Sequence, residues 1–405
     1  MKALVFSVNI PQYLGLQVLG KISPKLYYKG PLATVRLKDV PEPELPGPGW
    51  VKIRNRLCGV CASDINVIFL KDSPTASPFA SFPCIFGHEI MGEVIDTGSD
   101  VNGLSVGDKV TIAPHLDCAA REISPVCETC RSGRVGSCEN VSKGKLAPGM
   151  FTGVCSDIGG GFAPYLVAHQ SQVFKLPENI PPEAGVMIEP FAVALQAVID
   201  NMPEPGDTVL VIGGGVIGSL IVSSIRAFGI DCNVTVADPS PAAADTARKA
   251  GADNVICSGN LFERTAEITG AKRYKPMMGE EILMGGYKRI FDAVGHTGTI
   301  NTAMRCLASG GVLSVVGIGG DVKLDLTPLW LKLQTIKGAF SYGYTNITGE
   351  KKHVFDIAIE LVKEGKVNLS EMVTHSFSID ELEKMIKINL NKGSHGAIKT
   401  VVTFE

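Results

Sequence analysis

Two short segments of this chain combine residue types that bind zinc. Cys61 stands in the segment 59–64, beside small residues and a hydroxyl, and His88 and Glu89 follow Gly87 further along. A zinc held by three such side chains keeps a fourth position free for water or substrate, which distinguishes a catalytic zinc from a structural one. A lone cysteine or histidine is more often a core or surface residue. If Cys61 and His88 meet on one metal, the protein is an enzyme.

A second group of cysteines lies in a loop-like stretch rich in glycine, proline and arginine. Its four members fall within 21 residues: Cys118, Cys127, Cys130 and Cys138. A Cys-x-x-Cys turn chelates a metal, and four thiolates that leave no position for water form a closed, structural tetrahedral site. The alternative is a set of buried, reduced thiols. The spacing favours a structural zinc that holds a loop together and performs no chemistry.

A glycine-rich turn of the form G-x-G-x-x-G occupies residues 213–218. It follows the apolar run 209–212 and opens an apolar stretch of helix length, which is the context that this motif requires. Gly213 would make the turn, Gly215 would let backbone N–H groups approach a pyrophosphate, and Gly218 would permit close packing of helix and strand. The N-terminus of the helix would favour the anion. A plain structural turn in a glycine-rich chain is the alternative.

Asp238 strengthens the case for a dinucleotide. It lies twenty residues after Gly218, at the end of the next apolar strand, where a carboxylate binds the adenosine ribose hydroxyls. Its charge would repel a 2′-phosphate, and Pro239 and Ser240 supply no compensating cation. The sequence therefore predicts NAD rather than NADP as the cofactor.

The rest of the chain follows two patterns. Short alternating strands with Gly, Pro and Asp turns over residues 34–56 and 89–112 predict a compact β-rich domain. After Pro190, apolar strands alternate with helices, which predicts a parallel, doubly wound sheet covered on both faces. The expected strands include 209–212, 234–237, 254–256, 289–292, 312–316 and 400–403, and the expected helices include 241–249, 300–307, 353–364 and 379–390. The segments 9–33 and 258–288 fit neither pattern.

Length and composition exclude several other classes. A chain of 405 residues suits two domains, and a net charge of −3 argues against nucleic acid or an anionic membrane as a partner. Asn9, Pro11 and Gln12 interrupt the N-terminal apolar run, which predicts a first strand rather than a signal peptide. The uncharged stretch 209–225 suits a buried strand and helix better than a membrane span. Eleven cysteines without an export signal favour metal binding over disulfides. We expect a cytoplasmic protein.

Taken in chain order, these motifs resemble the zinc-dependent medium-chain alcohol dehydrogenases, including their threonine and polyol dehydrogenase branches. The resemblance runs from about Val35 to Phe404 and rests on the segments 59–64, 87–92 and 106–110, the four cysteines, Glu189-Pro190 and the turn 213–218. It implies an α/β protein with a GroES-like, zinc-binding catalytic domain formed by residues 1–190 and 342–405. A Rossmann domain for NAD, residues 191–341, would be inserted in it.

The resemblance also assigns roles to individual residues. Cys61 and His88 become ligands of a catalytic zinc, and Glu89 becomes a ligand or near-ligand that exchanges with water. Glu189 stands where the family places its remaining donor. Which of the two glutamates is the resting ligand stays open. Ser63 matches the hydroxyl that accepts the proton of the substrate alcohol.

Further positions follow from the same resemblance. Asp64 would orient a ligand imidazole, and Ile217 would back the nicotinamide ring. Lys399 falls where some relatives keep a basic residue against the pyrophosphate, and the alternative is a solvated lysine at a strand edge. The implied cofactor-binding residues are Gly213, Gly215, Val216, Ile217, Gly218, Asp238 and Lys399.

The chain departs from the family pattern in three respects. They are the segment of the four cysteines, which we call the lobe, the residues that carry the substrate proton away, and the length of two segments. The first cysteine of the family's lobe would fall at Ser124, whereas Cys118 comes six residues earlier. We expect a displaced ligand on a longer loop, because three thiolates alone would leave the metal open. Asn66 stands where many relatives have a histidine, so the proton's route beyond Ser63 must use cofactor ribose and water or another residue. The two segments that fit neither pattern are longer than usual, with a subunit contact or a substrate mouth as open alternatives.

The implied activity is reversible hydride transfer between an alcohol and NAD, with one catalytic and one structural zinc per chain. A zinc acting as Lewis acid would acidify the alcohol, and a carboxylate at Glu189 in place of a thiolate makes the metal harder. This favours secondary alcohols, polyols or amino alcohols. One alternative is a double-bond reductase of the same fold with only structural zinc, and a second is a non-catalytic NAD-binding protein. The expected partners are a small substrate and further copies of the chain, in a homodimer or homotetramer.

Overall fold

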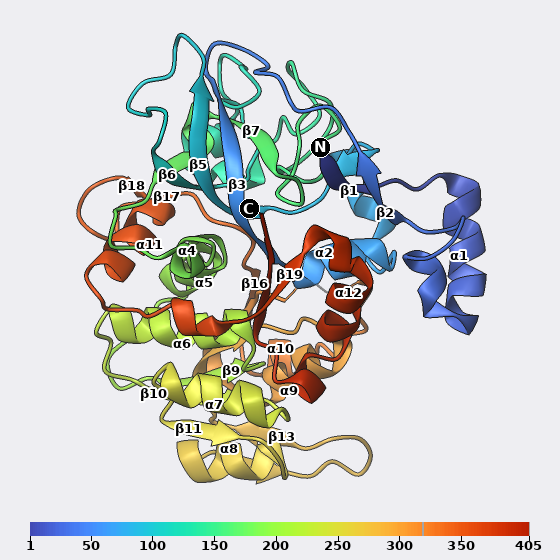
Figure 1. The fold of residues 1–405 in the computed structure, drawn as a ribbon. Coiled ribbons are helices and arrows are strands. Elements are labelled where there is room, and N and C mark those ends of the chain that lie inside the picture. The colour runs from blue at the N-terminus through green and yellow to red at the C-terminus, as the bar shows by residue number, and fades with distance from the viewer. Residues whose placement is uncertain (318–319, 405) are drawn as a thin grey trace. The chain divides into compact units, whose positions relative to one another are not determined.

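The computed structural model describes residues 1–317 and 320–404, so Ile318, Gly319 and Glu405, which fall in the predicted domain ranges, lie outside the described residues. Contacts divide the chain into two compact units. The terminal unit comprises Met1–Glu189 and Tyr342–Glu405, and the central unit comprises Pro190–Ser341. Figure 1 shows both units coloured along the chain.

The terminal unit is rich in antiparallel strands. Its larger sheet has the order β19-β20-β3-β5-β6-β8, with β7 also paired to β3, and its smaller sheet has the order β2-β1-β4. The strands are β1 (Lys2–Phe6), β2 (Val35–Asp39), β3 (Trp50–Val60), β4 (Cys84–Ile85), β5 (Glu89–Thr97), β6 (Lys109–Ile112), β7 (Tyr165–His169), β8 (Val173–Lys175), β17 (Tyr344–Thr345), β18 (Lys352–His353), β19 (Val373–Ser378) and β20 (Lys399–Thr403).

β3 forms the centre of the larger sheet and pairs antiparallel with β5, β7 and β20. Apolar side chains along it, among them Val51, Ile53 and Val60, are fully buried in one core cluster. In the β3–β5 register Gly59 lies opposite Glu89. The C-terminal end of β3 therefore meets the N-terminal end of β5, which brings the two predicted zinc-binding segments together.

The terminal unit also carries short helices around its sheets. They are α1 (Ile10–Ile22), α2 (Ala62–Ile68), α3 (Glu128–Arg131), α4 (Pro182–Gly185), α11 (Val354–Lys363) and α12 (Leu382–Leu390), and α5 (Ile188–Asp200) runs from this unit into the next. In the part of the chain that the structure describes, no helix has both the length and the apolar character needed to cross a bilayer.

The central unit has a six-stranded parallel sheet in the order β11-β10-β9-β14-β15-β16. With the strands of this sheet numbered in chain order, this is the order 3-2-1-4-5-6 of a dinucleotide-binding Rossmann fold, and it confirms the predicted fold class. Its strands are β9 (Thr208–Ile212), β10 (Asn233–Ala237), β11 (Asn254–Ile256), β14 (Tyr287–Asp292), β15 (Leu307–Val315) and β16 (Thr335–Gly338). Its helices are α6 (Val216–Ala227), α7 (Pro241–Lys249), α8 (Leu261–Thr269), α9 (Thr297–Cys306) and α10 (Thr327–Leu331).

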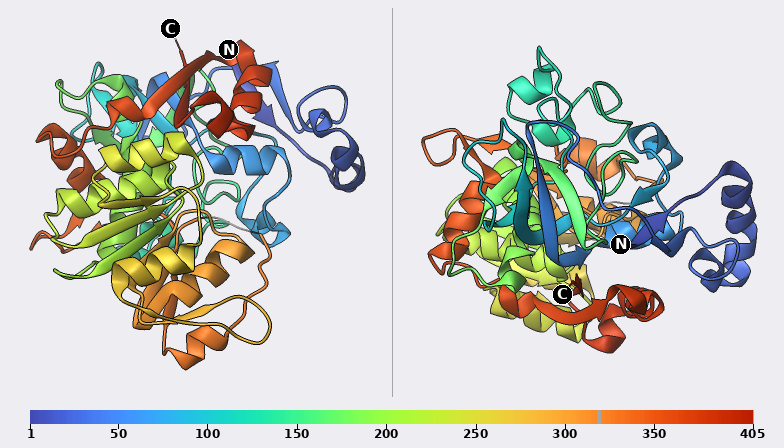
Figure 2. Two further views of the ribbon diagram at one scale, coloured as in Figure 1. Left: turned by 90° about the horizontal axis from the view of Figure 1, so that it is seen from below. Right: turned by 45° about the horizontal axis from the view of Figure 1, so that its top comes forward.

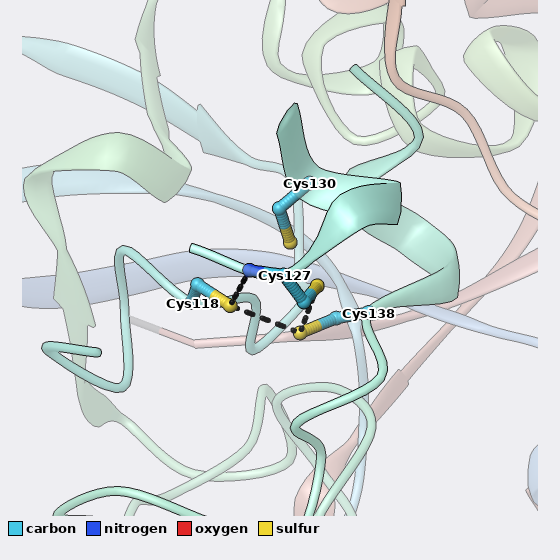
Figure 3. Close-up of side chains that lie close together, drawn as sticks. All are labelled: Cys118, Cys127, Cys130 and Cys138. Carbon is cyan, nitrogen blue, oxygen red and sulfur yellow. Dashed lines mark hydrogen bonds between the residues drawn. The ribbon is translucent and has the colours of Figure 1, made fainter. Parts of the chain in front are cut away.

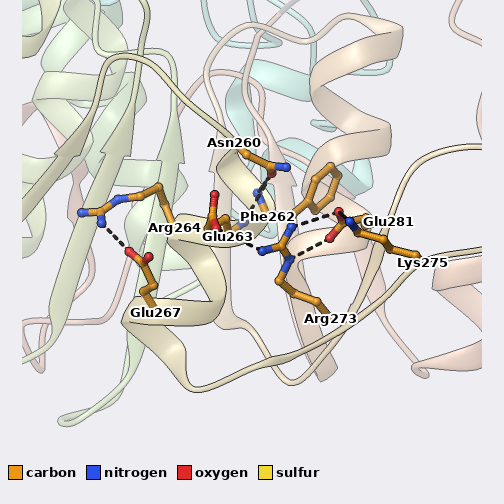
Figure 4. A network of polar contacts seen from close by, with 8 residues as sticks. All are labelled: Asn260, Phe262, Glu263, Arg264, Glu267, Arg273, Lys275 and Glu281. Carbon is orange, nitrogen blue, oxygen red and sulfur yellow. Dashed lines mark hydrogen bonds and ion pairs between the residues drawn. The ribbon is translucent and has the colours of Figure 1, made fainter.

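The segment 258–288 adds α8 and a hairpin of β12 (Lys272–Tyr274) and β13 (Ile282–Met284) to this unit. Across the hairpin, the Arg273 guanidinium donates to both carboxylate oxygens of Glu281 at 2.8 and 3.0 Å (Figure 4). Glu263 of α8 lies 3.4 Å from the same guanidinium, and Lys275 lies 3.8 Å from Glu281. Surface pairs of this kind contribute little individually, but the bidentate pair fixes the register of the hairpin.

The segment 9–33 forms α1 followed by the short 3₁₀ turn η1 (Pro24–Tyr27). The Asn9 side chain accepts the N–H of Gln12 and so caps the first turn, and Pro11 sits where its missing N–H costs nothing. In Figures 1 and 2, α1 stands apart from the sheets of the terminal unit.

Candidate metal centres and dinucleotide loop

Cys61, His88 and Glu89 converge in the terminal unit. One ligand atom from each lies within 4.8 Å of the others. Cys61 is the residue before α2, and His88 and Glu89 stand where β5 begins, so the β3–β5 pairing places all three. A side chain at Gly59 would collide with the Glu89 carboxylate. The glycine in the 59–64 segment is therefore what lets Glu89 face this group.

Asp64 fixes the geometry of two members of the group. Its Oδ2 accepts the backbone N–H of Cys61 at 2.8 Å, and its Oδ1 lies 3.5 Å from Nδ1 of His88. The Asp64 side chain is almost fully buried. A carboxylate behind a ligand imidazole fixes the ring's tautomer and orientation, which is the arrangement expected for Asp64 at a metal centre.

Lys399 forms a buried ion pair with Glu89, and both side chains are at most 3% exposed. The alternative of a solvated lysine at a strand edge is therefore wrong, because β20 lies inside the sheet between β19 and β3. Burial lowers the pKa of Lys399, but the charges of Glu89 and Cys61 outweigh it and raise the pKa above its usual value. The cation compensates a buried carboxylate that would otherwise be costly. A contact of Lys399 with pyrophosphate stays a prediction.

Glu189 lies at the start of α5, outside the group of three, and is 6% exposed. Its Oε1 accepts a hydrogen bond from the Tyr342 hydroxyl at 2.9 Å. Burial raises the pKa of Glu189 to about 7, with His88 lowering it and Glu89 raising it further. A buried carboxylate of this kind is easily ionised by a nearby cation. The geometry leaves both glutamates as candidates for the remaining ligand.

The donor set fits a zinc ion. It offers a thiol, an imidazole and carboxylates, with a carboxylate behind the imidazole. Burial alone would lower the pKa of His88, yet Asp64 and Cys61 raise it well above the usual value. The surroundings therefore attract positive charge, which a metal ion would supply in place of a proton.

Tyr342 belongs to a buried aromatic cluster next to Glu189. Its ring lies 4.7 Å from His115 and 4.8 Å from Phe355, between ring centroids, and 5.9 Å from His353. Burial lowers the pKa of His115 to about 3 and of His353 to about 4. Both histidines are therefore neutral near pH 7 and support Tyr342 without adding charge.

We expect His353 to make the protein less stable in mild acid. Its folded-state pKa lies below the ~6.5 of an unfolded histidine, so the unfolded chain binds the proton first as pH falls. The contribution of His353 to the free energy of unfolding is complete above about pH 6.5 and is lost as the pH falls toward about 4. Between pH 7 and pH 5 the free energy of unfolding should fall by about 2 kcal/mol because of this one group. The variant His353→Asn keeps an N-cap acceptor for α11. Between pH 7 and pH 5 its free energy of unfolding should therefore fall less than that of wild type, by about the amount that His353 contributes. Denaturant unfolding at both pH values measures this.

The exposed His395 provides the control, as His395→Asn. Equal pH dependence in wild type, His353→Asn and His395→Asn would contradict the assignment.

The four cysteines of the lobe also meet at one point (Figure 3). Their sulfurs lie within 4.8 Å of one another, with Cys118 and Cys138 3.7 Å apart and Cys127 and Cys138 3.9 Å apart. Cys130 points toward the other three from α3. Cys118, six residues earlier than the family spacing, therefore completes the group, and Ser124 is not needed in it.

The lobe contains N–H donors for the sulfurs as well. The backbone N–H of Cys127 and the Asn140 side chain donate to Sγ of Cys118 at 3.4 and 3.3 Å, and the backbone N–H of Asn140 donates to Cys138 at 3.4 Å. Burial raises the pKa of Cys138 to about 12, whereas a hydrogen bond from Thr129 and backbone donors outweigh burial and lower that of Cys127 to about 6. Four thiolates this close need a cation, and the donor set fits a structural zinc.

Arg121 holds the lobe together from inside. It is fully buried and donates to five backbone carbonyls at 2.6–3.1 Å: Leu116, Lys143, Leu146, Ala147 and Gly149. These carbonyls lie on both sides of the cysteines in the sequence, so one side chain ties the two ends of the metal loop.

The glycine turn of the central unit has the backbone that its motif requires. Gly213 has φ +92°, and a side chain at Gly218 would collide with the Gly213 carbonyl. The helix α6 begins directly after Gly215. Asp238 Oδ2 accepts the N–H of Gly214 at 2.7 Å, and Oδ1 accepts the N–H of Ser240 at 2.7 Å. Val216 and Ile217 form the first turn of α6 and are partly buried.

Three residues with roles at these sites were not predicted. Tyr342 is 153 positions from Glu189, and one sequence holds no signal for such a pair. Arg121 and Asn140 lie within the cysteine loop, where their polar types resemble ordinary loop residues. Ser63 lies in the first turn of α2, partly buried, and its proposed contact with substrate stays a prediction.

Comparison with known families assigns both parts of the chain. Residues 47–178 match the model of the alcohol dehydrogenase GroES-like domain, and residues 216–364 match that of the zinc-binding dehydrogenases. Among similar proteins, a probable D-xylulose reductase A of Aspergillus clavatus is 30% identical, and the match covers 91% of this chain and 93% of that protein. A sorbitol dehydrogenase of Arabidopsis thaliana is 28% identical, with 88% of each chain covered.

Solved structures share the fold. Galactitol-1-phosphate dehydrogenase from Escherichia coli superposes with a TM-score of 0.74 at 22% identity over the full length of both chains. The 2R,3R-butanediol dehydrogenase from Bacillus subtilis superposes with a TM-score of 0.71 at 24% identity, covering 92% of this chain and 96% of that one.

Proposed function

The chain belongs to the zinc-dependent medium-chain alcohol dehydrogenase family, and from this premise we propose that it oxidises a secondary hydroxyl of a polyol with NAD. Alcohol–ketone oxidoreduction is what the polyol dehydrogenases among its relatives share. The observation that carries the proposal is the convergence of Cys61, His88 and Glu89, with Glu189 nearby, in a buried group that attracts a cation. The double-bond reductase alternative offers no use for that group.

The proposed roles follow from the geometry. Cys61, His88 and one of the two glutamates would hold the catalytic zinc, which when bound supplies a Lewis acid that acidifies the substrate hydroxyl. Asp64 holds His88 and the backbone of Cys61 in place, and Ser63 accepts the hydroxyl proton. Asn66 cannot titrate, so the proton leaves Ser63 by another route.

Carboxylate ligands favour oxygen-rich substrates. Oxygen donors make the metal harder than a second thiolate would, and this suits exchange with water and hydroxyl groups. The relatives act on xylulose, sorbitol and idonate by their names, which supports polyols over amino alcohols. The test is a panel of polyols, secondary alcohols and amino alcohols with NAD, followed by NADH formation. NADH from polyols supports the proposal, and activity only on activated double bonds would overturn it.

For the cofactor, we propose that NAD binds at the glycine turn of the central unit with Asp238 at its adenosine ribose. Two zinc ions per chain, one in the lobe and one at the group of Cys61, complete the proposed holoenzyme. A cytoplasmic location and a homodimer or homotetramer stay predictions from the sequence.

We expect Asp238→Ala to raise the KM for NAD by at least about tenfold, because hydrogen bonds to a charged group contribute about 1.5–3 kcal/mol each. Its preference should shift toward NADP, since the charge that repels a 2′-phosphate is gone. The same variant also loses the acceptor for Gly214 N–H. Steady-state kinetics with both cofactors measures the change.

Asp238→Asn separates the two effects. Its amide oxygen can still accept the N–H of Gly214, but the negative charge is lost. It should gain NADP use and lower the unfolding midpoint less than Asp238→Ala does, because its amide NH2 replaces only the oxygen that accepts the N–H of Ser240. Unchanged NAD preference in both folded variants would show that Asp238 does not select the cofactor.

A further inference from the structure

Helix α1 exposes an apolar face. Its residues Ile10, Leu14, Val18 and Ile22 are 76%, 60%, 65% and 79% exposed. Residues four apart along a helix lie on one face, so these side chains form a continuous stripe. We call this set the α1 stripe. A helix with an uncovered apolar face marks a contact with another apolar phase or partner.

The opposite face of α1 is already used. Leu16 and Gly20 are buried there, and the Tyr27 hydroxyl donates to the Leu16 carbonyl at 3.0 Å. A side chain at Gly20 would collide with the Tyr27 ring. The helix is therefore held by this face, and rotating it to bury the α1 stripe would break these contacts.

The sequence segment that contains α1 is basic. The first 38 residues contain six basic side chains and no acidic one, in a chain with 41 acidic residues. The basic residues are Lys2, Lys21, Lys25, Lys29, Arg36 and Lys38. Lys2 pairs with Asp380 at 2.8 Å and Lys29 with Glu383 at 3.6 Å. Among the described residues, no ion pair involves Lys21 or Lys25, and both are exposed.

We propose that α1 lies flat on an anionic phospholipid surface, with the α1 stripe in the boundary between headgroups and acyl chains. Lys21 and Lys25 then face the anionic headgroups, and their long stems allow the ammonium groups to reach them. At 13 residues α1 is too short to span a bilayer, so the association is peripheral. The net charge of −3 led to the opposite expectation because it hides this local distribution.

A second copy of the chain is a poorer partner for this face. A two-fold contact through α1 would bring two basic, acid-free segments into one interface, and neither would neutralise the other. An anionic lipid surface supplies both an apolar layer and the opposite charge.

The test is sedimentation of the full chain with vesicles at low ionic strength. The vesicles are phosphatidylcholine alone, or phosphatidylcholine with about a third phosphatidylglycerol. We expect binding to the anionic vesicles, weakened by salt, and little binding to the neutral ones. The double variant Leu14→Ser with Val18→Ser should lose at least about tenfold in affinity. The double variant Lys21→Gln with Lys25→Gln should lose the preference for anionic lipid.

Matched controls alter two exposed apolar residues and two exposed lysines elsewhere. Met277 and Met278 are 104% and 90% exposed on the hairpin, so Met277→Ser with Met278→Ser removes apolar surface from the central unit and leaves α1 unchanged. Lys249→Gln with Lys363→Gln removes two exposed charges from other helices. Both controls should bind like wild type, and all variants should keep the wild-type unfolding midpoint.

Two results would overturn the proposal. One is wild-type protein that stays in solution with both kinds of vesicle. The other is a Leu14→Ser with Val18→Ser variant that binds like wild type. If wild type does not bind vesicles and the Leu14→Ser with Val18→Ser variant forms a smaller oligomer than wild type, a second copy covers the α1 stripe.

Discussion

The Cys61→Ala variant should lose at least about a thousandfold in kcat/KM for polyol oxidation, which corresponds to about 4 kcal/mol of transition-state stabilisation. Cys61 supplies the one thiolate of the candidate catalytic group, and its loss leaves His88 and carboxylates to hold the metal. Zinc content should fall by one per chain, because the lobe cysteines are untouched. Kinetics and metal analysis on the same sample measure both effects.

Cys257→Ser provides the control for a cysteine change. Cys257 is a partly buried free cysteine of the central unit and belongs to neither candidate metal group. It should keep both zinc ions and full activity. A Cys61→Ala enzyme that is fully active and has unchanged zinc content would contradict a catalytic zinc at this position and favour the double-bond reductase alternative.

The second large effect concerns stability. Arg121→Ala should lower the free energy of unfolding of the terminal unit by about 4 kcal/mol, because five buried carbonyls lose a charged donor at once. The free energy of unfolding of Arg121→Lys should lie between those of wild type and Arg121→Ala, since an ammonium has three donors rather than five. The lobe zinc should be released faster from both variants. Denaturant unfolding with a chromophoric zinc indicator follows stability and release together.

Arg131 is the matched control in the same loop. Its side chain is 64% exposed and pairs with Glu128 at 2.9 Å, so Arg131→Ala should change stability by less than about 1 kcal/mol. If Arg121→Ala and Arg131→Ala unfold and release zinc alike, the hydrogen bonds of the Arg121 side chain do not stabilise the lobe.

The features that local sequence encodes were predicted well. The helix 241–249 matches α7, because Ser240 and Pro241 carry the start signals and the Ser240 side chain caps it. The parallel sheet followed from its apolar runs, which alternate with helices at regular intervals. The fold of the β-rich domain was predicted from the family resemblance, which the match to the GroES-like domain confirms.

The features that depend on distant residues were missed. The Tyr342–Glu189 hydrogen bond and the Lys399–Glu89 ion pair join positions that only the folded sheet brings together. The carbonyls that Arg121 binds have no sequence signature, because every residue has one. Net charge summed over the chain concealed the basic segment that contains α1, because charge acts locally in a salt solution.

The most direct test of hydride transfer from a polyol to NAD follows the fate of the carbinol hydrogen. A polyol deuterated at its secondary carbinol carbon is incubated with NAD and the zinc-loaded enzyme, and the reduced cofactor is analysed by mass spectrometry. We expect NADH that carries the deuterium, formed by wild type and at least about a thousandfold more slowly by Cys61→Ala. Wild-type enzyme that forms no deuterated NADH from any polyol, yet oxidises NADH or NADPH with activated double bonds, would contradict it.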